Sequence, residues 1–99
     1  MQDASRLSTT QTIAYTASSA AITNAFGAQT YQIRVAANSA CHIKIGDGVQ
    51  TATTSDPFLP ANWPEYITVT PGQRISAIRA STGGLVTATD GTLWVTEVT

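Results

Sequence analysis

The chain has 99 residues, of which 42% are hydrophobic and 11% are charged, and its formal net charge is −1. A chain of this length forms one domain that buries roughly 60–68% of its unfolded surface, enough for one modest core. Its 5 basic residues are scattered, so no basic patch for nucleic acid is visible. No stretch approaches the ~18 apolar residues of a membrane span. We therefore expect neither a nucleic-acid-binding protein nor a membrane protein.

The N-terminal stretch MQDASRLSTT is polar and has no periodicity. Residues 1–10 are therefore predicted to be a flexible arm, and residues 11–99 the folded domain. The arm lacks the basic start and apolar run of a secretory signal. Cys41 is the only cysteine, so the chain has no internal disulfide, which fits synthesis in a reducing cytoplasm.

Two strands are predicted in the first half of the chain. The runs YQIRVA at 31–36 and CHIKIG at 41–46 place apolar side chains at every second position, as strands with one wet face do. The Asn-Ser pair at 38–39 predicts a hairpin between them. Gly-Asp-Gly at 46–48 ends the second strand with residues that tolerate positive φ.

A threonine-rich stretch, residues 49–56, is predicted to be an extended crossing. A strand over residues 65–70 follows, with Ile67 and Val69 facing inward. The Pro-Gly pair at 71–72 predicts a type II turn, because proline fixes the first φ and glycine accepts the positive second φ.

The next strand contains Ile78 out of phase with its alternation, which indicates a bulge or a strand covered by apolar layers on both faces. Gly-Gly at 83–84 and Asp-Gly at 90–91 are further turn signals. The final strand, residues 93–98, places Trp94 on the face opposite its two apolar neighbours.

No long stretch of the sequence has apolar residues at helical spacing. The alanine-rich residues 17–28 are compatible with a short helical turn at most. Short strands with turns about every 8–12 residues predict an all-β fold: a single-domain antiparallel β-sandwich or a barrel. The predicted core residues are Tyr31, Ile33, Val35, Cys41, Ile43, Ile45, Ile67, Val69, Ile75 and Val95.

Residues capable of catalysis or metal binding do not form a recognisable motif. His42 is the only histidine and Cys41 points to the other face of the strand, so His42 is expected to be a solvated strand residue. Cys41 has apolar neighbours in the alternation and is expected to be a buried, inert thiol. The acids are dispersed, and neither a phosphate loop nor a nucleophile elbow is present. A Ser-His-Asp triad is assembled in space, so spacing does not exclude one. We assign no catalytic, cofactor-binding or metal-ligating residue and expect a non-enzyme.

The segment FLPANWPEYITV at 58–69 concentrates aromatic residues and prolines. As a lid it would cap the core, and as a surface it would present rigid anchors for another protein. Trp63 suits both roles equally, whereas Phe58 and Trp94 suit the core better. We expect the exposed side of this segment to be a contact surface for another protein. The predicted interface residues are Leu7, from the N-terminal arm, and Phe58, Trp63 and Tyr66, from the segment.

Four segments carry a resemblance to a known family: TIAYTASSAAI at 12–22, IRVAANSACHIKIGDG at 33–48, TATTSDPFLPANWPEYITVTPGQRISAI at 51–78 and GTLWVTEVT at 91–99. In this order they resemble small virion structural proteins of tailed bacteriophages. The resemblance runs from about Thr12 to the C-terminus. It implies an all-β, jelly-roll-like domain that works by assembly, and it carries over no catalytic residues.

We therefore expect a non-enzymatic capsid cement or decoration protein that stabilises a phage head, made in the bacterial host cytoplasm and located in the virion. It would need no cofactor and would contact the major capsid protein or other virion proteins. Low charge and the polar arm favour a homo-oligomer, with a trimer preferred. The alternatives are a neck or tail component, or a carbohydrate- or ligand-binding β-sandwich that uses Trp63 or Trp94 as a stacking platform.

Overall fold

A computed structural model of the chain describes residues 7–81 and 89–98. The predicted all-β class is confirmed, because these residues form strands and loops and contain no helix, in residues 17–28 or elsewhere. The strands are β1 (Leu7–Tyr15), β2 (Ala20–Ala21), β3 (Gln32–Ala37), β4 (Cys41–Asp47), β5 (Phe58–Leu59), β6 (Glu65–Thr68), β7 (Gln73–Arg79) and β8 (Gly91–Val98).

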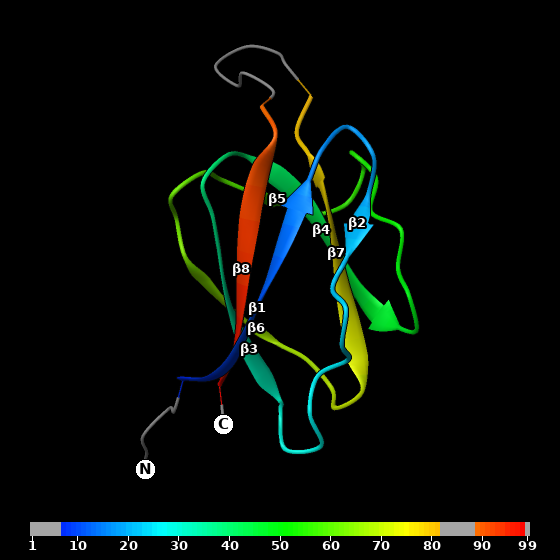
Figure 1. Ribbon diagram of the computed structural model, residues 1–99, viewed down its shortest axis with the longest axis vertical. Helices are drawn as coiled ribbons and strands as arrows, with labels where there is room; N and C mark the ends of the chain where they lie inside the picture. The colour runs from blue at the N-terminus through cyan, green and yellow to red at the C-terminus, as the bar shows by residue number, and fades with distance from the viewer. Residues whose placement is uncertain (1–6, 82–88, 99) are drawn as a thin grey trace.

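The strands form two antiparallel sheets of four strands each (Figure 1). The first sheet has the order β1-β8-β3-β6, and the second has the order β2-β7-β4-β5. Among the described strands, β4 and β5 are the one bonded pair that is consecutive in the chain. All other bonded pairs join strands that are distant in sequence, so the fold depends on long-range pairing.

The hairpin predicted at Asn38 and Ser39 is wrong, because β3 lies in the first sheet and β4 in the second. The two polar residues instead fasten the crossing between the sheets. Asn38 exchanges hydrogen bonds with Thr92: its Oδ1 accepts the Thr92 N–H at 2.9 Å, and its own N–H donates to the Thr92 carbonyl at 3.3 Å. The Tyr15 hydroxyl donates to the Ser39 carbonyl at 2.5 Å. These bonds leave no room beside Gly91, where a Cβ would lie 2.6 Å from both Asn38 Oδ1 and Tyr15 OH.

The turn predicted at Pro71 and Gly72 is present. Gly72 has φ of 87°, and the Gln73 N–H donates to the Thr70 carbonyl at 3.1 Å. This geometry is the one in which a turn requires glycine at its second central position. The turn leads from β6 in the first sheet to β7 in the second.

The bulge considered at Ile78 is absent, because the register between β4 and β7 is continuous. The other explanation, a strand covered on both faces, agrees better with β7. Ser76 lies on the outer face yet is fully buried, and its hydroxyl donates to the Gln50 carbonyl. The Ala52 N–H donates to Ser19 Oγ at 2.8 Å. The crossing predicted at residues 49–56 therefore lies over the outer face of β7, and backbone rather than an apolar layer covers it.

One hydrophobic cluster contains side chains from both sheets. Seven of the ten predicted core residues are buried in it, while Ile45 and Ile67 pack against it partly buried. Tyr31 was predicted to be core and is 63% exposed, so that prediction is wrong. Tyr31 precedes β3, which begins at Gln32, so the strand alternation does not extend to its side chain, although its carbonyl still accepts the Val69 N–H at 2.9 Å. The buried apolar residues that were absent from the predicted core list are Ile13, Tyr15, Ile22, Phe26, Ala37, Ala52, Leu59, Ala77, Ala80, Leu93 and Val98.

Three sequence predictions concern segments at the limits of the described residues. Residues 7–10, assigned to the arm, are part of β1, and the rest of the arm lies outside the described residues. The turn signal at 83–84 also lies outside them. At the other signal, Gly91 begins β8 and the Asp90 carboxylate pairs with the Arg79 guanidinium at 2.9 Å.

Candidate protein-interaction surface

Large apolar side chains lie on the surface of the described part of the chain. All four residues predicted to form an interface are among them, with exposed fractions from 45% for Phe58 to 65% for Trp63. A contact surface requires such exposure, and a core lid would not have it. The complete set is Leu7, Tyr31, Val49, Phe58, Trp63, Tyr66 and Trp94.

Trp63 lies in the connection between β5 and β6, which are edge strands of different sheets. The connection is fixed at its centre, because the Asn62 N–H donates to the Ala37 carbonyl at 2.7 Å at the end of β3. Asn62 has φ of 59°, a left-handed conformation that asparagine tolerates better than most residues. Pro60 and Pro64 restrict φ on either side. Trp63 is therefore an exposed side chain on a restrained backbone.

Phe58 and Trp94 were expected to fit the core, and both expectations are wrong. Phe58 is 45% exposed and its ring meets the His42 ring edge to face, with centroids 5.4 Å apart. Trp94 is 41% exposed because it alternates with Leu93 and Val95, which point into the core. The alternation in the sequence had already placed Trp94 on the face opposite the core, so its exposure could have been predicted.

His42 is half-buried on β4, where its ring contacts neighbouring residues. Its Nδ1 lies 2.8 Å from the Asp56 carbonyl oxygen. Since a carbonyl only accepts, the ring donates from Nδ1. This bond and the Phe58 contact fasten residues 56–58 to β4. Within residues 7–81 and 89–98, no cluster of three His, Cys, Asp or Glu side chains is placed to hold a metal ion.

Cys41 is a buried thiol, as predicted. Burial raises its pKa from the ordinary 9.0 to about 11, and the neighbouring Tyr15 hydroxyl offsets part of this rise. A thiol with this pKa is protonated at neutral pH, and the thiolate is the form that acts as nucleophile or metal ligand. The site geometry thus gives Cys41 a packing role.

The raised thiol pKa predicts a loss of stability in alkaline solution. The unfolded thiol releases its proton near pH 9.0 and the folded thiol near pH 11. Stability from the neutral buried thiol is therefore complete below the first value and is lost as pH rises through the second. We expect the free energy of unfolding to fall between about pH 8 and about pH 10.5. Urea titrations at both values test this.

The control for this prediction is Cys41→Ala, which should show a smaller decline over the same range. Some decline should remain, because burial also raises the pKa of Tyr15 above its ordinary 10.0. Equal declines in the two proteins would contradict the prediction.

The outer face of the first sheet is nearly free of charge. Trp94 on β8 lies between Thr12 of β1 and Ala36 of β3 in register. Arg34, two residues before Ala36 on β3, lies beside Tyr66 of β6. This face therefore presents aromatic rings among threonine and alanine.

The four predicted interface residues do not form one patch. Phe58, Trp63 and Tyr66 belong to a single segment on the side of the molecule where β5 and β6 are the sheet edges. Leu7 lies on β1, the opposite edge of the first sheet. The segment of residues 58–66 is the compact part of the predicted interface, and we call it the aromatic segment.

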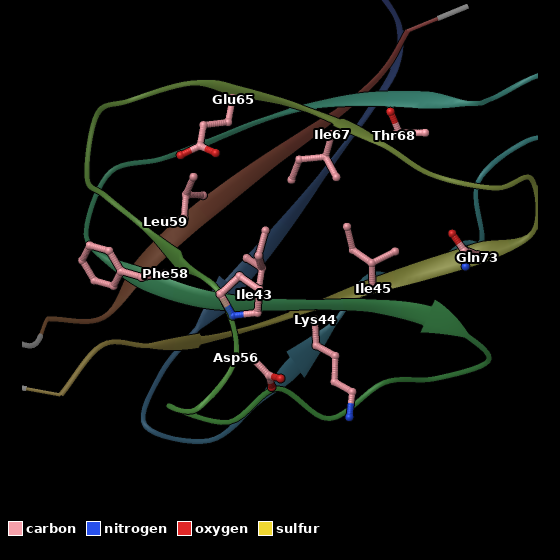
Figure 2. A pocket seen from close by; sticks show the side chains of 11 residues that line it. Ile43, Lys44, Ile45, Asp56, Phe58, Leu59, Glu65, Ile67, Thr68 and Gln73 are labelled. Atoms are coloured by element: carbon pink, nitrogen blue, oxygen red, sulfur yellow. The ribbon is translucent and has the colours of Figure 1, made fainter.

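A groove of about 650 Å³ lies beside the aromatic segment, between β4 and β5 of the second sheet and β6 of the first. Figure 2 shows Ile45 on β4 and Ile67 on β6 pointing toward one another across it. No pattern in the sequence had indicated this groove. Its lining is Ile43, Lys44, Ile45, Asp56, Pro57, Phe58, Leu59, Glu65, Ile67, Thr68 and Gln73.

Comparisons of the chain with protein-family models, with curated proteins and with solved structures gave no match. The part of the chain that the structure describes holds no helix capable of spanning a membrane.

Proposed function

We propose that this chain is a non-enzymatic virion structural protein of a tailed bacteriophage and acts as a capsid cement or decoration protein. The observation that carries the proposal is the exposure of Trp63 at 65% on a backbone held by the Asn62 bond. Rigid, exposed aromatic side chains concentrate binding energy in protein interfaces. The resemblance of four segments to small phage virion proteins supports the same function.

We also propose that the two sheets pack as a jelly-roll sandwich. The first strand pairs with the eighth, the second with the seventh, the third with the sixth and the fourth with the fifth. This is the order of one long hairpin rolled into two sheets, the arrangement expected of an eight-stranded jelly roll. Viral capsid domains are among the proteins that use it.

The proposed contacts are protein–protein contacts within a homo-oligomer, with a trimer favoured, and with the major capsid protein. Only 11% of the residues are charged, and Arg34 beside Tyr66 is the charged neighbour in register on this face, so little desolvation opposes burial of the rest of it. A restrained segment also loses less conformational entropy on binding than a flexible loop does. The protein would be made in the host cytoplasm and incorporated into the virion. A neck or tail position would use the same surface.

Trp63→Ala is expected to weaken self-assembly or capsid binding at least about tenfold, because truncated anchor residues typically cost about 2 kcal/mol or more. The stability of the subunit should change by less than about 0.5 kcal/mol, since Trp63 lies outside the core. Light scattering at micromolar concentration and thermal unfolding measure the two effects.

Val49→Ala is the matched control, because Val49 is 73% exposed but lies outside the aromatic segment. The contribution of the arm is tested by deleting residues 1–6 alone, since residues 7–10 belong to β1. A monomeric wild-type chain that binds neither capsids nor tails would contradict the proposal. Unfolding of Trp63→Ala would show instead that the segment supports the core.

The second candidate function is carbohydrate binding on the outer face of the first sheet. Its supporting observation is the exposure of Trp94 and Tyr66 on a nearly uncharged face. Saturable binding on a glycan array that Trp94→Ala abolishes would favour this function. An absence of glycan binding would leave assembly as the function of the chain.

A further inference from the structure

Among the described residues, Arg34 is the one charged residue on the outer face of the first sheet. Its neighbours on β3, Ile33 and Val35, are fully buried in the core, so strand alternation turns Arg34 outward. In register, Thr96 of β8 lies on one side of Arg34 and Tyr66 of β6 lies on the other. The side chain is half-buried between these strands, so its positive charge has a defined place on the face.

No acidic side chain among the described residues shares this face with Arg34. Glu65 and Glu97 occupy core-facing positions of β6 and β8, and Glu97 is buried, where its carboxylate accepts the Thr30 hydroxyl. The remaining described acids lie in the second sheet or in loops: Asp47, Asp56 and Asp90. The ion pair found among the described side chains is that of Arg79 with Asp90. The outer face therefore carries one positive charge that an anion would complement.

An exposed aromatic ring lies within reach of this charge. Trp94 of β8 is in register with Ala36, which follows Arg34 by two residues on the same face of β3. Residues on adjacent strands that are offset by two positions are diagonal neighbours, about 7–8 Å apart. Because Ala36 has only a methyl group, no large side chain separates the Trp94 ring from β3. A ligand stacked on Trp94 could therefore place an acidic group against Arg34.

Hydroxyl groups, rather than apolar side chains, surround these two residues. Thr12 of β1 is in register with Trp94 and is exposed. Thr96, in register with Arg34, exchanges a hydrogen bond with Thr10 at 3.0 Å. A hydroxyl both donates and accepts hydrogen bonds, which suits the hydroxyl groups of a sugar. The apolar face of a sugar ring, in turn, suits an aromatic ring.

The size of this face favours a small ligand over a protein partner. Its four strands span about 15 Å, and the 8 residues of β8 span about 25 Å, which gives an area of roughly 400 Å². A stable protein interface buries about 800 Å² on each partner. The face alone is about half that size. Nucleic acid is also disfavoured, because a phosphate chain calls for several basic residues and this face has one.

We propose that the outer face of the first sheet binds a sugar that carries a carboxylate, with its ring stacked on Trp94 and its carboxylate paired with Arg34. A guanidinium forms two parallel hydrogen bonds with a carboxylate, so Arg34 would select this group as well as attract it. The inference rests on the carbohydrate-binding candidate function and specifies the class of sugar. It does not rest on the virion assignment.

The test compares methyl β-glucuronide with methyl β-glucoside, which has a hydroxymethyl group in place of the carboxylate. The glucuronide should bind about fivefold more tightly, a difference of about 1 kcal/mol. Nuclear magnetic resonance titration measures both affinities. The indole N–H signal of Trp94 should shift, whereas that of Trp63, which lies in the connection between β5 and β6, should not. Trp63 is thus an internal control in the same sample.

Two arginine variants separate the local charge from the net charge. Arg34→Gln should remove the preference, so that the two sugars bind with equal affinity. Arg74→Gln removes the same charge from β7 in the second sheet and should keep the preference. Trp94→Ala should abolish binding of both sugars. Thermal unfolding shows whether each variant folds.

The outcomes distinguish this inference from the function on which it rests. Equal binding of the two sugars at Trp94 would overturn the carboxylate preference and leave the carbohydrate-binding function standing. No shift at Trp94 with about 10 mM of either sugar would overturn the inference. In that case, binding of another, neutral glycan that Trp94→Ala abolishes would still uphold carbohydrate binding. Weaker capsid binding by Arg34→Gln, without a response to either sugar, would assign the face to a protein partner and overturn the inference as well.

Discussion

Replacing Ile33 with alanine is expected to lower the free energy of unfolding by about 2–5 kcal/mol, the usual cost of removing a buried isoleucine. Ile33 is fully buried in β3, between Glu97 of β8 and Ile67 of β6 in register. Strands on both sides fix its backbone, so the neighbouring residues can move little to fill the cavity that the alanine would leave. Urea denaturation with a constant m-value measures the loss.

Ile43→Ala should cost a similar amount, because Ile43 is only 6% exposed. Ile45→Ala is the control: it removes the same atoms from the same strand, but Ile45 borders the groove and is partly buried. Its loss should be clearly smaller. A loss below about 0.5 kcal/mol for Ile33→Ala would show that the core is not packed around β3 as described.

Gly91→Ala is expected to destabilise the protein by about 1–3 kcal/mol, the cost of forcing extra volume into a packed site. The new methyl group would meet Asn38 Oδ1 and Tyr15 OH at 2.6 Å, and Ser39 Oγ as well. These atoms cannot retreat freely, because Asn38 is bonded to Thr92 and the Tyr15 hydroxyl to Ser39. The measurement is again the free energy of unfolding.

Gly48 is the matched control for this prediction, because nothing lies within 4 Å of the position that a methyl group would occupy there, and its φ is 72°. Gly48→Ala should therefore cost only backbone strain, which asparagine relieves: Gly48→Asn should be better tolerated than Gly48→Ala. Gly91→Asn should be worse than Gly91→Ala, because crowding increases with size. The opposite order at Gly91 would show that crowding is not the cause.

Alternation predicted the interior of the strands well, because burial on one face imposes a period of two on the sequence. It identified Ile33, Val35 and Ile43 as core and placed Cys41 among them. The same rule set Trp94 on the outer face, but hydrophobicity then favoured the core for it, and the alternation was the better guide. Periodicity carries information on the face of a side chain, whereas hydrophobicity does not.

Strand partners were beyond sequence reasoning. Asn38 and Ser39 have the composition of a hairpin turn, yet their side chains and backbone bond to β8 and β1. Turn propensity is local and does not say whether the chain returns to the same sheet. The groove was unpredictable as well, because it lies between strands of different sheets that are distant in sequence.

The nested pairing of the strands also determines when in its synthesis the chain can fold. Thr10 on β1 bonds Thr96 on β8 across 86 positions of sequence, and β8 separates β1 from β3 in the first sheet. While the chain is on the ribosome, β4 and β5 can pair early. The first sheet cannot join β1 to β3 until β8, which lies between them, has emerged. Chains dominated by such distant pairings fold slowly and expose unpaired edges meanwhile. The first sheet of the nascent protein therefore stays incomplete until β8, the last of the described strands, has been made.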